Sequence, residues 1–126
     1  MATLAVLRHE EGIYVDAERL VPIYHGRAKR EAEAVLERAI EDLASRLREI
    51  QLQFDEADAQ ALVRSVRLVA RMAERLGMTS FTTVASDLIA TTEAGDGTAQ
   101  AATLARLLRV ADRSVTALWD LRDMTM

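Results

Sequence analysis

Cysteine is absent from this 126-residue sequence, and proline occurs once, at Pro22. The absence of cysteine excludes disulfide bonds, thiol catalysis and cysteine-based metal sites, and it fits a reducing compartment. Aromatic residues make up only 4% of the chain, so a core must be built from Leu, Val, Ile and Ala, which suits helix packing. No apolar run approaches the roughly 20 residues that are needed to cross a bilayer.

Hydrophobic residues account for 50% of the chain and charged residues for 29%, which is enough for one buried core in a soluble domain. The net charge of -4 argues against a nucleic-acid-binding module, because affinity for phosphate backbones depends on clustered Lys and Arg. The N-terminal segment has no basic residues ahead of its short apolar run, so it does not resemble a signal peptide. We therefore expect a cytoplasmic protein that binds neither nucleic acid nor membrane.

Residues 1–26 differ in pattern from the rest of the chain. Two short runs that favour β-structure, Leu4–Leu7 and Ile13–Val15, flank residues 9–12, and a glycine at the end of such a loop is typical of a hairpin. Because an isolated hairpin is marginally stable in water, we expect this one to pack on the helices or on a second copy of the chain. The apolar run Leu20–Tyr24 also lacks a local partner. We assign residues 1–26 to this extension and residues 27–126 to a helical domain.

From Arg27 onward, apolar residues recur at the spacing of one helix face. The second helix is expected to begin with Asp55 as its N-cap and Asp58 in its first turn, and to end at Gly77. The expected buried face of the first helix comprises Val35, Leu36, Ala39, Ile40, Leu43, Leu47 and Ile50. That of the second helix comprises Leu62, Val66, Val69, Ala73 and Leu76.

A third, shorter helix is expected to have Thr79 or Ser80 as its N-cap and to end before the break at Gly95-Asp96-Gly97. A fourth helix would begin at Thr98. Four amphipathic helices with short connections predict an all-α fold, an antiparallel up-down four-helix bundle with a short N-terminal extension. The third helix would bury Phe81, Val84, Ala85, Leu88 and Ile89. The fourth would bury Leu104, Leu107, Leu108, Ala111, Val115 and Leu118.

Residue patterns of known catalytic and metal sites are missing from the sequence. Neither His9 nor His25 has a second ligand at the spacing of a helical metal site, and adjacent residues in an extended segment point in opposite directions. No serine lies in a nucleophile-elbow context, and no glycine-rich loop resembles a phosphate cradle. We therefore expect no enzyme activity, no metal and no cofactor.

The most distinctive feature is a row of arginines in the second helix. Arg64, Arg67, Arg71 and Arg75 are spaced by three, four and four residues, so they span roughly 80° of arc opposite the expected core face. One interpretation is an ordinary solvated face, paired with the acidic first helix. The other is a docking strip for an acidic surface, because the guanidinium fork matches carboxylates.

The segment from Leu68 to Phe81 resembles the central stretch of histidine-containing phosphotransfer (HPt) domains. Gly77 matches the glycine that closes the His-bearing helix in that family, residues 79–93 match the short helix that follows, and Gly95-Asp96 matches the next turn. The motif His-x-x-Lys-Gly is missing, because its His falls on Arg67, its Lys on Ala70 and its Gly on Arg71. The resemblance therefore implies a degenerate member that cannot accept a phosphoryl group, since a guanidinium stays protonated.

The resemblance also implies a partner, because HPt domains dock on the acidic rim of receiver domains through the exposed side of that helix. The expected function is a non-catalytic module of two-component signalling that occupies a receiver or histidine-kinase domain. An alternative is a homodimeric assembly protein whose N-terminal extension packs on its twin, and a third is an enzyme or ligand binder whose site is invisible in the sequence. The expected contact residues are Arg64, Arg67, Leu68, Arg71, Arg75, Thr83 and Asp87.

Overall fold

The computed structural model describes residues 6–8 and 12–124. The expected hairpin loop around His9, and the start of the first apolar run at Leu4, lie outside the described residues. In chain order the described elements are β1 (Val6–Arg8), β2 (Tyr14–Asp16), a 3-10 turn η1 (Ala17–Leu20), α1 (Val21–Tyr24), α2 (Lys29–Asp55), α3 (Ala59–Arg75), α4 (Thr79–Glu93) and α5 (Gly97–Met124).

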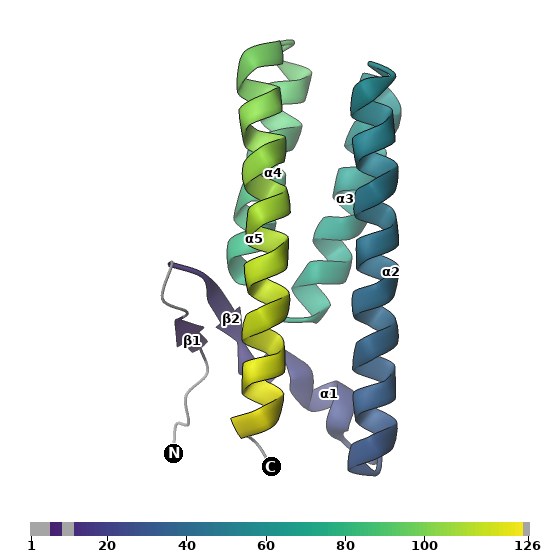
Figure 1. The fold of residues 1–126 in the computed structure, drawn as a ribbon, viewed down its shortest axis with the longest axis vertical. Helices are drawn as coiled ribbons and strands as arrows, with labels where there is room; N and C mark the ends of the chain where they lie inside the picture. The colour runs from purple at the N-terminus through teal and green to yellow at the C-terminus, as the bar shows by residue number, and fades with distance from the viewer. Residues whose placement is uncertain (1–5, 9–11, 125–126) are drawn as a thin grey trace.

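The described chain is mainly helical, which confirms the predicted all-α class. Its helices number five rather than four, because residues 21–24 form the single turn α1. Pro22 lies in the first turn of α1, where its fixed φ suits a helix and its missing N–H leaves no bond unmade. Such a turn is too short for apolar periodicity to reveal. In Figure 1 the four long helices lie alongside one another, and the chain rises along α2, descends along α3, rises along α4 and descends along α5.

The helix boundaries differ from the expected ones where caps were assigned. Asp55 is not an N-cap, because it is the last residue of α2. Asp58 caps α3 instead, with its carboxylate oxygen accepting from the Ala61 N–H at 3.1 Å. Likewise, Met78 rather than Thr79 or Ser80 occupies the N-cap position of α4. At the start of α5, Asp96 accepts from the Ala99 N–H at 3.1 Å, and the helix begins at Gly97 rather than Thr98.

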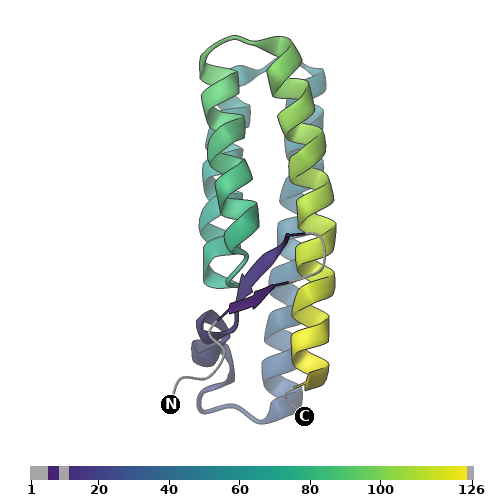
Figure 2. The ribbon, with the colours of Figure 1, turned by 90° about the vertical axis from the view of Figure 1, so that its left-hand side faces the viewer.

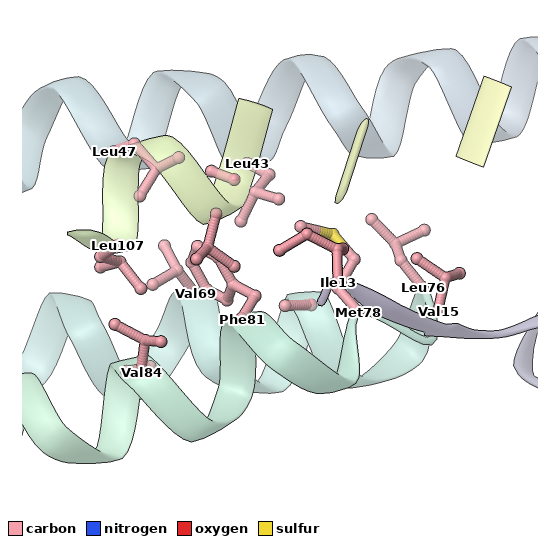
Figure 3. Packing of buried hydrophobic residues seen from close by; sticks show 14 of the residues in the cluster. Ile13, Val15, Leu43, Leu47, Val69, Leu76, Met78, Phe81, Val84 and Leu107 are labelled. Carbon is pink, nitrogen blue, oxygen red and sulfur yellow. The ribbon is translucent and has the colours of Figure 1, made fainter. Parts of the chain in front are cut away.

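The buried apolar side chains form one cluster that includes most of the residues expected on the buried faces of α2 to α5. Figure 3 shows part of this cluster, with Phe81 and Leu107 among its members. Val35 was expected in the core but is 37% exposed. It lies at the edge of the buried face of α2, beside Leu36, and turns into a groove lined also by α1 and α3. Among the other expected core residues, Ala39, Ile40, Ile89, Leu108 and Val115 are partly buried.

The N-terminal extension contributes to this same core. β1 pairs with β2 in antiparallel register, with Leu7 opposite Val15, in agreement with the predicted hairpin. Ile13, Val15 and Leu20 are 3%, 0% and 8% exposed, so they are covered within the chain. Figure 2 shows the hairpin in front of the lower part of the helices, and β2 contacts both α4 and α5.

Two hydrogen bonds connect β2 to the junction between α3 and α4. The Tyr14 N–H donates to the Ser80 hydroxyl oxygen at 2.8 Å, and the Asp16 N–H donates to the Gly77 carbonyl at 2.7 Å. These bonds satisfy polar groups of a strand edge that would otherwise be unpaired. The extension therefore packs on the helices, one of the two arrangements expected for it. Within the described part of the chain, no helix combines the length and apolar character of a membrane span.

Candidate functional site

The four arginines of α3 form an exposed row, named here the arginine stripe: Arg64, Arg67, Arg71 and Arg75. The opposite face of α3 is buried through Leu62, Val66, Val69 and Ala73. Asp58 caps the helix start and Gly77 follows its end, so the whole stripe lies within one uninterrupted helix. The helix thus holds four guanidinium groups on one side, directed toward solvent.

The ion pairs of the stripe differ from the expected pairing with the acidic first helix. Arg67 Nη2 lies 3.5 Å from Glu93 Oε2, at the end of α4, and both side chains are more than half exposed. Among the described residues, no ion pair joins Arg64, Arg71 or Arg75 to a carboxylate. Three of the four positive charges are therefore available to an outside partner, and the fourth is held by a weak exposed pair.

Leu68 lies at the edge of the stripe that faces α2. It is partly buried and lines a hollow of about 290 Å³ with Met72 and with Asp42, Ser45, Arg46 and Glu49 of α2. Arg75, at the end of the stripe, lines a larger groove of about 550 Å³ between α1, α2 and α3. The stripe is therefore bordered on its α2 side by a hollow in which two apolar side chains, Leu68 and Met72, lie among polar and charged ones.

Thr83 and Asp87 lie away from the arginine stripe. Asp87 Oδ2 is 3.9 Å from Arg106 Nη1 of α5, and Thr83 lines a groove shared with α5 and the hairpin. The side of α4 that reaches α3 carries Glu93 instead. The structure therefore brings Arg64, Arg67, Arg71 and Arg75 together with Leu68, and it places Thr83 and Asp87 beside α5 instead.

A second group of arginines lies outside the site predicted from the sequence. Arg106, Arg109 and Arg113 of α5 line the groove that contains Thr83, named here the arginine groove, which has a volume of about 380 Å³. Their spacing of three and four residues is the same signal that revealed the stripe on α3. The remaining lining residues are Gly12, Ile13, Tyr14, Ser80, Thr83, Val84 and Val110.

A further cavity, of about 370 Å³, lies where α1 meets the start of α2 and the end of α5. Its lining is apolar apart from Tyr24, Arg27, Lys29 and Arg122. Burial raises the pKa of the Tyr24 phenol, the negative charge of Glu33 raises it further, and the positive charge of Arg122 lowers it. The phenol is thus held in its neutral form, and no base lies among the lining residues to activate it.

His25 is exposed at the end of α1, and His9 lies outside the described residues. No group of three or more His, Asp or Glu side chains that could hold a metal ion occurs in residues 6–8 and 12–124.

Comparison of the chain with protein-family models, curated protein sequences and solved structures found no match. The HPt resemblance is therefore a hypothesis that rests on the sequence pattern alone. The geometry of the arginine stripe does not depend on it.

Proposed function

We propose that this chain is a non-catalytic protein-binding module that docks an acidic surface of its partner on the arginine stripe. The observation that carries the proposal is the charge state of the stripe. Four arginines point to one side of α3, and only Arg67 has an ionic partner among the described residues. Because guanidinium groups bind carboxylates in a bidentate fork, such a row selects a partner rich in Asp or Glu.

The proposed partner is a receiver or histidine-kinase domain of two-component signalling. The order of elements supports it: α3 ends at a glycine, the 15-residue α4 is shorter than its neighbours, and a 28-residue helix follows the next turn. We interpret α2 to α5 as an antiparallel up-down four-helix bundle of the HPt kind, with α1 and the hairpin closing one end. The rim of a receiver active site is acidic and complements the stripe.

Position 67 sets what the module does once it is bound. In the proposed alignment Arg67 replaces the phospho-accepting histidine, and arginine stays protonated and has no nucleophilic nitrogen. Its contact with Glu93 is long and exposed, so the side chain can be recruited by a partner at little cost. The module would therefore occupy the docking surface of a signalling partner without carrying phosphate.

The alternative is a homodimeric assembly protein. The N-terminal extension does not need a second copy of the chain to cover it, because Ile13, Val15 and Leu20 are buried within the chain itself. It therefore gives this alternative no support. What favours it is the apolar surface that stays exposed near α1, where Val21 is 59% and Val35 is 37% exposed. A concentration-dependent change of mass in sedimentation, abolished by Val21→Asp, would support this alternative.

The decisive experiment compares the wild-type chain with Arg67→Glu and Arg38→Glu as baits in an extract of the source cells. Arg38 is exposed on α2 and is not part of the stripe, and its variant has the same charge change. We expect the wild type and Arg38→Glu to capture a receiver or kinase domain, and Arg67→Glu to lose it. The captured domain, once purified, should bind with the same ranking in a direct titration.

A circular dichroism melt of each variant separates loss of binding from loss of fold. Because position 67 is exposed, the two variants should unfold within a few degrees of the wild type. Equal capture by all three proteins would overturn the role of the stripe. Capture of an acidic partner unrelated to two-component signalling would keep the stripe and overturn the HPt interpretation.

A further inference from the structure

We propose that the arginine groove between the hairpin, α4 and α5 is a binding site for a small organic phosphate. None of the described lining residues of the groove belongs to α3, so this site is separate from the arginine stripe and independent of the proposed protein-docking function. Its volume of about 380 Å³ falls within the range of small-molecule sites, about 300–1,000 Å³.

The charge of the lining is the first argument. Of the ten described residues that line the groove, three are arginines and none is acidic, although the whole chain has a net charge of -4. The larger groove beside α1 differs, because Glu18 and Asp42 accompany its cations. Like charges are thus gathered among the described lining residues of the arginine groove, and they attract an anion.

The arrangement of the donors is the second argument. Arg106, Arg109 and Arg113 follow one another on the same side of two turns of α5, so their forks reach one region. The opposite wall contributes the Ser80 and Thr83 hydroxyls of α4. The Ser80 oxygen accepts from the Tyr14 N–H at 2.8 Å, and this bond leaves the hydroxyl hydrogen to be donated to an anion.

The ion pair between Arg106 and Asp87 is weak enough to yield to a ligand. Arg106 lies 3.9 Å from Asp87, and these side chains are 58% and 55% exposed. Exposed pairs of this length contribute little, so a doubly charged phosphate group competes favourably for Arg106.

The apolar part of the lining argues for an organic phosphate rather than free phosphate. Ile13, Val84 and Val110 are buried side chains that border the groove, and Tyr14 is 39% exposed at its edge. A ligand that carries an apolar ring or chain beside its phosphate would cover this surface, and it would gain affinity in proportion to the area removed from water.

The test is a titration of the isotope-labelled chain with phenyl phosphate, inorganic phosphate and benzyl alcohol, followed by amide NMR. We expect saturable shifts at Tyr14, Thr83 and Arg109, tighter binding of phenyl phosphate than of inorganic phosphate, and no binding of benzyl alcohol. Arg109→Gln should weaken the affinity for phenyl phosphate about tenfold, because one charge-assisted contact is lost.

Arg71→Gln is the matched control, since it removes the same charge from the stripe on α3. It should leave the affinity for phenyl phosphate within about twofold of the wild type, because exposed charges beyond a Debye length are screened. Three outcomes would overturn the proposal: shifts that do not saturate, shifts as large at Arg71 as at Arg109, or equal weakening by both variants. Equal affinity for phenyl phosphate and inorganic phosphate would overturn the assignment to an organic ligand.

Discussion

Gly77 is a single residue on which two separate parts of the structure depend. It follows the end of α3 with a φ of 74°, a left-handed conformation that favours glycine. A Cβ atom at this position would collide with the carbonyl group of Asp16 in the hairpin. The Gly77 carbonyl also accepts the Asp16 N–H at 2.7 Å, so the close approach is maintained by a hydrogen bond. The glycine is thus needed both to end the helix and to seat β2.

We predict that Gly77→Ala lowers the free energy of unfolding by about 3 kcal/mol or more. The left-handed backbone costs an alanine about 1–2 kcal/mol, and the displaced hairpin loses a hydrogen bond worth about 1 kcal/mol together with apolar contacts. Gly95→Ala is the control, since Gly95 has a similar φ of 71° and open space where a Cβ atom would lie. Gly95→Ala should cost only the backbone term, about 1–2 kcal/mol.

Urea unfolding of both variants, analysed with one common m-value, measures the difference between their free energies of unfolding. A cost for Gly77→Ala no larger than that for Gly95→Ala would show that the hairpin can move away from α3 without loss.

The sequence offers two neighbouring N-cap candidates for α3, and only one of them caps the helix in the structure. Asp55 and Asp58 are both good N-cap residues, and both precede an apolar pattern. In the structure α2 runs on to Asp55, and Ala57, with a φ of 58°, reverses the chain before Asp58 caps α3. A carboxylate at Asp55 therefore lies at the negative end of the dipole of α2, where it is disfavoured.

We predict that Asp58→Ala lowers the free energy of unfolding by about 1 kcal/mol, the usual effect of losing an N-cap side chain. Asp55→Ala should be neutral or slightly stabilising, by up to about 0.5 kcal/mol, because it removes a negative charge from a helix C-terminus. Thermal unfolding followed by circular dichroism compares the two. The reverse order, with Asp55→Ala the more harmful, would mean that Asp55 rather than Asp58 caps α3.

At the scale of the whole molecule, the N-terminal extension and the helices share one core. Val15 is fully buried, and its cluster also contains Phe81 of α4 and Leu107 of α5. Figure 3 shows Ile13 and Val15 close to the side chains of the α3–α4 junction, Leu76 and Met78. The hairpin is therefore a structural part of the helical assembly, and its stability comes from covering the lower end of the core.

We predict that Val15→Ala lowers the free energy of unfolding by about 2 kcal/mol, the cost of lost apolar burial and a small cavity. Val21→Ala removes the same atoms from a side chain that is 59% exposed, and it should change the free energy by less than about 0.5 kcal/mol. Denaturation monitored at Trp119 and by far-ultraviolet circular dichroism should give coincident transitions for both variants. A separate early transition in either probe would mean that the extension unfolds independently.

The arginine stripe and the arginine groove illustrate how far spacing alone can predict a site. Arginines at intervals of three and four share a helix face by geometry, so their spacing is sufficient to group Arg64 to Arg75. Thr83 and Asp87 were assigned to the same patch by the HPt resemblance, but α4 is rotated so that Asp87 reaches Arg106 of α5. The rotation of a helix about its axis depends on its packing on both neighbours, which no local pattern contains.

By itself the sequence determined the four long helices, most of their buried faces, and the glycines Gly77 and Gly95 that follow α3 and α4. These features follow from helical periodicity and from the backbone preferences of Gly, Pro and Asp, which act over a few neighbouring residues. Tertiary structure alone decided that the hairpin seals the chain's own core, that Val35 turns out of it, and that Arg106, Arg109 and Arg113 share a groove with Ser80. These outcomes depend on contacts between residues far apart in the chain, and burial at such contacts is fixed only when all the helices pack together.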